Sequence, residues 1–125
     1  MPVRGIRGAI VVDQDQSETV LAATRELLQA ICAANPLLQP DDLASAIFTV
    51  TGDLTSIYPA QAARQLGWVH VPLLSAREID VPGGMPRCIR VLLHWNTDLP
   101  QTEIQHVYLG AAASLRPDLS ANQEG

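Results

Sequence analysis

Arginine is the residue type in this sequence whose placement indicates chemistry. All eight cationic side chains are arginine, and two of them, Arg7 and Arg90, lie inside apolar segments. A guanidinium there is costly to bury unless an anion pairs with it, and its planar fork binds carboxylates through two parallel hydrogen bonds. The two arginines therefore indicate an anion site, filled by a carboxylate of the protein or of a ligand. For either arginine taken singly, a structural ion pair or an exposed strand edge is the commoner outcome.

Motifs for covalent or metal-assisted chemistry are missing from the sequence. The serines lack the context of a nucleophile elbow, and neither Cys32 nor Cys88 lies beside a helix start with a histidine close by. No histidine or cysteine spacing marks a metal site, and the glycines form neither a dinucleotide fingerprint nor a phosphate-binding loop. We therefore expect the protein to use no metal and no cofactor. The residues by themselves indicate an anion pocket without naming a reaction.

Composition excludes several classes of partner. The chain has 125 residues, a formal net charge of −5 and an aromatic content of 4%. This acidic, lysine-free composition disfavours nucleic acid as a partner, and no apolar run is long enough for a membrane span. The first residues do not resemble a signal peptide, so we expect a cytoplasmic protein with reduced thiols. The apolar content of 47% favours surface that is buried between copies of the chain.

Local patterns predict one α+β (mixed α/β) domain around a single sheet. Apolar and β-branched runs predict the following strands: Val3 to Val12, Ala46 to Thr51, Trp68 to Leu73, Cys88 to Thr97 and His106 to Leu115. Helical spacing predicts a long helix from an N-cap at Ser17 to Asn35, and turn residues predict short helical segments at Pro40 to Leu43, Pro59 to Gly67 and Thr102 to Gln105. Strand alternation places Arg7 with Ala9 on one face, and Arg90 with Leu92 and His94.

Three motifs together resemble the monofunctional, barrel-type chorismate mutases. They are Arg4-Gly-Ile-Arg-Gly-Ala9, Pro82-Gly-Gly-Met-Pro-Arg-Cys-Ile-Arg-Val91, and His106-Val-Tyr-Leu109 with Leu115-Arg-Pro-Asp-Leu119. The resemblance runs from about residue 3 to 119, which implies one chorismate mutase-like domain over residues 1–119, with 120–125 as a flexible tail. It also implies a homotrimer in which five-stranded mixed sheets, each with one long helix, form a pseudo-α/β barrel with active sites between subunits.

The implied reaction is the Claisen rearrangement of chorismate to prephenate in phenylalanine and tyrosine biosynthesis. This unimolecular rearrangement of a dianion needs no nucleophile, metal or cofactor, which agrees with the motifs that are missing. Negative charge develops on the ether oxygen as its C–O bond breaks. A cation fixed at that oxygen stabilises the transition state more than the ground state.

The resemblance assigns roles to individual residues. Arg90 resembles the cation at the ether oxygen, Arg7 and Tyr108 resemble partners of the side-chain carboxylate, and Glu78 resembles the acceptor for the ring hydroxyl. These four are the implied catalytic residues. The remaining substrate-binding residues implied by the family are Tyr58, Ala60, Arg64, Leu73, Leu74, Ser75, Leu115 and Arg116. Tyr58 stands where phenylalanine is familiar in the family, and Ser75 stands where some members have cysteine.

Two other functions stay open. Trimeric imine deaminases of the Rid type share a similar topology and also bind a carboxylate with an arginine between subunits, although they activate water. A trimer that binds a metabolite of the aromatic pathway without converting it would carry the same pocket. The local motifs favour the mutase over the deaminase.

Overall fold

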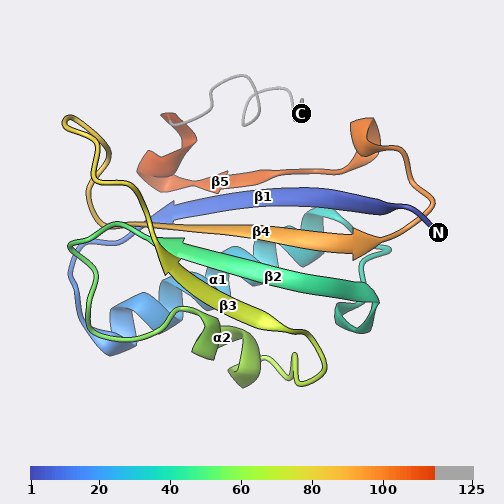
Figure 1. The fold of residues 1–125 in the computed structure, drawn as a ribbon, viewed down its shortest axis with the longest axis horizontal. Helices are drawn as coiled ribbons and strands as arrows, with labels where there is room; N and C mark the ends of the chain where they lie inside the picture. The colour runs from blue at the N-terminus through green and yellow to red at the C-terminus, as the bar shows by residue number, and fades with distance from the viewer. Residues whose placement is uncertain (115–125) are drawn as a thin grey trace.

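A computed structural model describes residues 1–114 of the chain. Five strands and two α-helices account for most of these residues, and short 3-10 segments (η1–η3) connect them (Figure 1). In chain order the elements are β1 (Val3–Val11), α1 (Ser17–Ala34), η1 (Pro40–Asp42), β2 (Leu43–Val50), α2 (Ala60–Gln65), β3 (Leu73–Arg77), β4 (Cys88–Asn96), η2 (Gln101–Glu103), β5 (Val107–Leu109) and η3 (Gly110–Ser114). The expected tail at 120–125 lies outside the described residues.

The strands form one mixed sheet in the order β3-β2-β4-β1-β5. The central strand β4 runs antiparallel to both β1 and β2, whereas the outer pairs β2–β3 and β1–β5 are parallel. This arrangement confirms the expected five-stranded mixed sheet with one long helix. Within residues 1–114, no helix has both the length and the apolar character needed to cross a bilayer.

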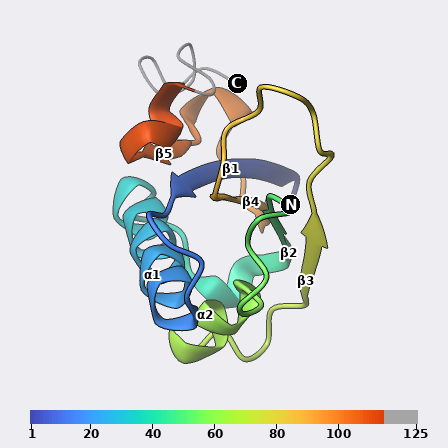
Figure 2. The same cartoon turned by 90° about the vertical axis from the view of Figure 1, so that its left-hand side faces the viewer.

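Both α-helices lie on one side of the sheet, as the end-on view shows (Figure 2). The core lies between the helices and the sheet. It contains alternate residues of the strands, among them Ile6 and Ile10 of β1 and Ile89 and Leu93 of β4. Gly8 lies in the same row, and a Cβ atom at this position would be only 2.8 Å from Ile31 Cδ1 of α1. The absence of a side chain at Gly8 therefore lets the long helix approach the sheet closely.

The opposite side of the sheet, which we call the open face, carries the other alternate residues. Arg7 and Ala9 of β1 share this face, as the alternation within that strand predicts. Arg90 of β4 joins them because it lies opposite Ala9 in the strand register. Leu74 is 61% exposed and Leu92 is 37% exposed on this face. The open face is therefore partly apolar, with arginine side chains among the exposed leucines.

The strand predicted from Trp68 to Leu73 is wrong, because β3 begins only at Leu73. Trp68 and Val71 are buried in the core, whereas Val69 and His70 between them are exposed. Bulky residues that enter the core from a loop therefore looked like a strand. The Trp68 amide donates to the Ala63 carbonyl at 3.0 Å, so this loop caps α2.

Two other boundaries differ from the expectations. Among the described residues 106–114 of the predicted strand, only Val107–Leu109 form one, because the chain turns at Gly110, with a φ of 58°, into η3. Ser17 is the first residue of α1 and not its cap; Gln16 occupies that position. The Ser17 hydroxyl instead donates to the carbonyl of Ser56, 3.2 Å away.

Candidate active site

The open face contains a hollow of about 240 Å³, which we call the arginine hollow. It brings together all four residues to which the resemblance assigns catalytic roles, although they come from four separate segments of the chain. Its lining residues are Arg7, Gly8, Ile47, Thr49, Glu78, Arg90, Val91, Leu92 and Tyr108. The sheet therefore gathers cations, a carboxylate and a phenol around one small space.

Strand register explains why these residues meet. Arg90 lies opposite Ala9 of β1 on one side and opposite Thr49 of β2 on the other. Tyr108 of β5 pairs with Ala9 in turn, so its side chain lies on the same face as Arg90. The amide of Arg7 donates to the His106 Nδ1 atom at 3.0 Å, which fastens β5 to β1. The position of Tyr108 thus depends on a contact between residues far apart in the sequence.

The start of β4 is held by a small polar network. Arg87 is the one non-glycine residue of the described chain with a positive φ, 49°, a conformation that costs energy for a side chain of this size. Its backbone amide donates to both carboxylate oxygens of Asp53 at 3.1 and 3.0 Å, and its Nε donates to the Val12 carbonyl at 2.9 Å. The Cys88 amide donates to the Thr51 hydroxyl at 3.0 Å. These contacts set where β4 begins and therefore which way Arg90 points.

Arg90 and Tyr108 keep hydrogen-bonding capacity within the arginine hollow. The Arg90 Nε lies 3.8 Å from Glu78 Oε2, which is too long for a hydrogen bond. Both Arg90 Nε and the Tyr108 hydroxyl are buried and find no hydrogen-bond partner among residues 1–114. An unsatisfied buried donor is costly, so these two groups are arranged for an acceptor from outside the described chain.

Cys88 lies two residues before Arg90 on the same face of β4. Its thiol is fully buried against Ala9, Tyr108 and Ala112. Burial raises the pKa of the Cys88 thiol, and the neighbouring Arg90 only partly offsets this rise. A thiol whose pKa is raised stays protonated and unreactive at neutral pH, so Cys88 serves here as a small packing residue.

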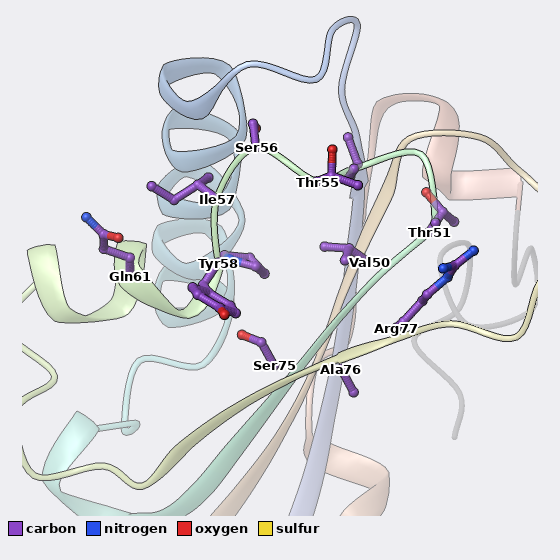
Figure 3. Close-up of a pocket in the computed structure, with 13 residues that line it drawn as sticks. Val50, Thr51, Thr55, Ser56, Ile57, Tyr58, Gln61, Ser75, Ala76 and Arg77 are labelled. Atoms are coloured by element: carbon purple, nitrogen blue, oxygen red, sulfur yellow. The ribbon is translucent and has the colours of Figure 1, made fainter.

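A second hollow, of about 590 Å³, lies between β3 and the segment that follows β2 (Figure 3). We call it the tyrosine hollow; its lining residues are Val50, Thr51, Gly52, Leu54, Thr55, Ser56, Ile57, Tyr58, Pro59, Gln61, Ser75, Ala76 and Arg77. Figure 3 shows Ser75 pointing toward the Tyr58 ring, and the buried Ser75 hydroxyl has no hydrogen-bond partner among residues 1–114. Tyr58 is 75% exposed.

The remaining expected site residues are scattered. Arg64 and Leu73 line a third hollow of about 310 Å³ near Trp68. Leu74 lies exposed on the open face, while Ala60 is buried in the core. Leu115 and Arg116 fall outside the described residues. Within residues 1–114, a single chain therefore does not bring the expected substrate-binding residues around one cavity.

Five residues that line the arginine hollow were not predicted as site residues: Gly8, Val91, Leu92, Ile47 and Thr49. The last two, Ile47 and Thr49, both lie on β2. Thr49 donates a short hydrogen bond to Glu78 Oε2. The alternation in the strand predicted from Ala46 to Thr51 places both residues on one face, but it does not say which strand lies beside them. That signal became informative only with the register of β2 against β4.

The arrangement suits a small anionic ligand. Two guanidinium groups can bind carboxylates, the Glu78 carboxylate can accept a hydrogen bond from a hydroxyl, and Tyr108 can donate one. Fixed donors of this kind stabilise negative charge that develops during a reaction, because they need no reorganisation.

Comparisons with known proteins agree with this chemistry. A family model, chorismate mutase type I, matches residues 3–119. The protein named chorismate mutase AroH from Thermus thermophilus is 59% identical over 121 residues, which cover 97% of this chain and 99% of that protein. Its namesake from Bacillus subtilis (strain 168) is 45% identical over 121 residues, covering 96% of this chain and 94% of that protein.

A solved structure gives the same result in three dimensions. The chorismate mutase from Clostridium thermocellum superposes with a TM-score of 0.85 at 44% identity, covering 88% of this chain and 97% of that chain. The chain therefore belongs to the type I chorismate mutase family, and its activity is that of a chorismate mutase, an isomerase.

Proposed function

We propose that the arginine hollow binds chorismate and converts it to prephenate by electrostatic stabilisation and conformational restriction, without a covalent intermediate. Arg90 donates to the ether oxygen as its C–O bond breaks. Arg7 and Tyr108 hold the side-chain carboxylate, and Glu78 accepts a hydrogen bond from the ring hydroxyl. The observation that carries this proposal is the buried Arg90 Nε without an acceptor among residues 1–114, in a hollow that also holds the other three groups.

Charge development explains why a fixed guanidinium accelerates this reaction. The ether oxygen is neutral in chorismate and gains negative charge as the C–O bond lengthens. A donor that is already in place strengthens its interaction as that charge grows, so it stabilises the transition state more than the substrate. Holding the flexible enolpyruvyl side chain folded over the ring lowers the barrier further, because the reacting carbons are then already close.

We propose further that the complete site forms between two copies of the chain in a homotrimer. Strand parity supports this, because Arg90 lies on the open face, whereas Ser75 pairs with core residue Phe48 and lies on the helix side. The two hollows of one chain therefore face different directions, and the tyrosine hollow of one copy would close the arginine hollow of another. The exposed Leu74 and Leu92 offer apolar surface for that contact. In this arrangement Tyr58, Ala60, Arg64, Leu73, Leu74 and Ser75 complete the substrate-binding site, and Leu115 and Arg116 close its entrance.

The same proposal includes the domain and its location. One chorismate mutase domain covers residues 1–119, and the enzyme works in the cytoplasm.

Direct conversion of the substrate tests the proposal. Purified protein added to chorismate should remove its absorbance and produce prephenate at an equal rate in light and heavy water, because no proton is transferred. The Arg90→Ala variant, shown to be folded by circular dichroism, should lose this activity. A solvent isotope effect, or an active Arg90→Ala variant, would contradict the mechanism, and a monomeric mass in solution would contradict the trimer.

A further inference from the structure

We propose that Thr49 is a positioning residue that holds the Glu78 carboxylate away from Arg90, so that both charged groups stay available to the substrate. This inference rests on the proposed roles of Glu78 and Arg90. It concerns the free enzyme, in which a carboxylate and a guanidinium face each other across a small hollow with no substrate between them.

Glu78 is held by two consecutive residues of β2. Its backbone amide donates to the Val50 carbonyl at 2.9 Å, and its Oε2 accepts the short hydrogen bond from the Thr49 hydroxyl. Thr49 lies directly opposite Arg90 in the register of β2 and β4. The hydroxyl is therefore attached to the same sheet as the guanidinium, and this rigid frame sets the distance between the two charges.

The distance is the unusual feature. Glu78 Oε2 lies 3.8 Å from Arg90 Nε, whereas a direct charge-assisted hydrogen bond has a length of about 2.8 Å. The side chains are 27% and 36% exposed, respectively, so neither is held apart by deep burial. A small movement of the carboxylate would close the pair, and the hydrogen bond from Thr49 opposes that movement.

Closure of the pair would harm the enzyme. The Arg90 Nε–H group that should meet the substrate would then be occupied by Glu78. Substrate would bind only to the fraction of molecules in which the pair is open, so the apparent affinity would fall by that fraction. Once substrate is bound, the pair is already separated, and the chemical step is almost unaffected.

The test compares Thr49→Val with Thr49→Ser. Valine keeps the branched shape and removes the hydroxyl, so KM should rise about tenfold, the effect of one hydrogen bond to a charged group, while kcat changes less than about twofold. Serine keeps the hydroxyl and should restore KM. Circular dichroism and solution mass confirm fold and assembly, and Thr49→Ala supplies a second variant without the hydroxyl if Thr49→Val fails to fold.

Ser45→Ala is a matched control. Ser45 lies on the same strand as Thr49, and its hydroxyl is 2.9 Å from His94 Nδ1 across the same pair of strands, outside the arginine hollow. Its loss should leave KM within about twofold of the parent value. An equal rise in KM for Ser45→Ala and Thr49→Val would mean that the sheet was disturbed generally, which overturns the proposal.

A Glu78→Gln background separates this inference from the proposed function. Glutamine cannot form the ion pair, so Thr49→Val should have no further effect on KM in that background. The same tenfold rise there, an unchanged KM in folded Thr49→Val, or no restoration by serine would overturn the role of Thr49. If folded Glu78→Ala, which removes the acceptor for the ring hydroxyl, kept full kcat/KM, the proposed role of Glu78 itself would fail.

Discussion

The arginine hollow and the tyrosine hollow differ in what they offer a ligand. The first holds two guanidinium groups and a carboxylate within about 240 Å³ on the open face. The second is larger, about 590 Å³, and its walls are mainly hydroxyl, apolar and backbone groups, with Arg77 at one end. One hollow therefore offers charged groups to a ligand, whereas the other offers mainly hydroxyl and apolar groups and would, in the proposed trimer, form a wall of the site.

The difference teaches how a small sheet can build a charged site. Arg90 and Tyr108 are anchored on paired strands, so their donors stay fixed without a ligand. Tyr58 lies on a connecting segment that is held to the N-terminal side of α1 by Asp15, whose carboxylate accepts hydrogen bonds from Thr55 and Ser56. Rigid elements carry the groups that must be preorganised, and a loop carries the wall.

The largest expected effect comes from changing the cation. Arg90→Lys should lower kcat by about 10²- to 10³-fold, because a flexible point charge does not keep the geometry of the fork. Steady-state kinetics with chorismate measure the change. Arg25→Lys is the control, because Arg25 lies on α1 and donates a hydrogen bond to Gln65 of α2. This variant should keep kcat within about twofold of the parent value. Near-normal kcat in folded Arg90→Lys would mean that the arginine hollow does not supply a charge that acts on the reaction.

Mixed assemblies test whether the hollows of different copies complete each other. Arg90→Ala damages one hollow, and Ser75→Trp fills the other, so each variant alone should be inactive. Refolding them together at equal amounts should restore about one site in four, because mixed rings contain one interface that joins two intact hollows. The rate is compared with that of each variant alone, after solution mass confirms trimers. If activity does not return, the two hollows do not form a shared site.

Two glycines, one in each hollow, allow the packing of the two regions to be compared through the free energy of unfolding. A Cβ atom at Gly8, in the arginine hollow, would lie 2.8 Å from Ile31 Cδ1 and 3.2 Å from the Val107 carbonyl, both in packed surroundings. A Cβ at Gly52, in the tyrosine hollow, would come nearest to the end of the exposed Arg77 side chain, which can move. Gly8→Ala should therefore cost about 1–3 kcal/mol of the free energy of unfolding.

Gly52→Ala is the matched variant and should cost less than about 1 kcal/mol. Urea unfolding measures both values on the same scale. Equal losses would show that the backbone under the arginine hollow is no more tightly packed than the loop of the tyrosine hollow.

The smallest expected effect concerns the hydrogen bonds by which Asp15 holds the segment that carries Tyr58. Hydrogen bonds to the Asp15 carboxyl hold its pKa below the usual value of 3.8. The backbone amide of Thr55 makes the largest contribution, and hydrogen bonds from Ser56 add to it. A lowered pKa in the folded protein means that this stabilisation is complete above the unfolded value and is lost as the pH falls through the folded value. Asp15→Asn should therefore melt below the parent at neutral pH, and the difference should shrink under strongly acidic conditions.

Melting curves of both proteins from about pH 7 to about pH 3 measure this convergence. A difference that stays constant across the range would mean that the carboxylate charge of Asp15 does not hold the loop.

The sequence predicted the parts of the fold that depend on neighbours in the chain. Period-two alternation placed Arg7 with Ala9 on one face of its strand and Arg90 with Leu92 on one face of another, although it did not show that these faces coincide. Helical spacing identified α1 even with Thr24 in its buried stripe. The Thr24 hydroxyl donates to the Val20 carbonyl at 2.7 Å within the helix, which satisfies it without a partner elsewhere. The prediction of a strand at Trp68 and Val71 was wrong, because residues of loops are buried in the core as well as residues of strands.

The roles of site residues came from a resemblance and not from local chemistry. Arginine in a strand is ambiguous on its own, and nothing around Glu78 distinguishes it from a surface carboxylate. Thr49 was missed because its significance lies in a side-chain contact with a residue twenty-nine positions away.

The sequence alone determined which side chains share a face within each strand. It also showed the absence of local motifs for metal or nucleophilic chemistry and the presence of three motifs that identify the family. Tertiary structure decided that Thr49, Glu78 and Arg90 meet, and that Ser75 lies on the other side of the sheet. The physical reason is that register and strand order are long-range properties: β4 lies between two strands from earlier in the chain, and the edge strand β3 pairs with β2 in parallel. Local preference selects the face of each side chain, and only packing of the whole sheet selects its neighbours.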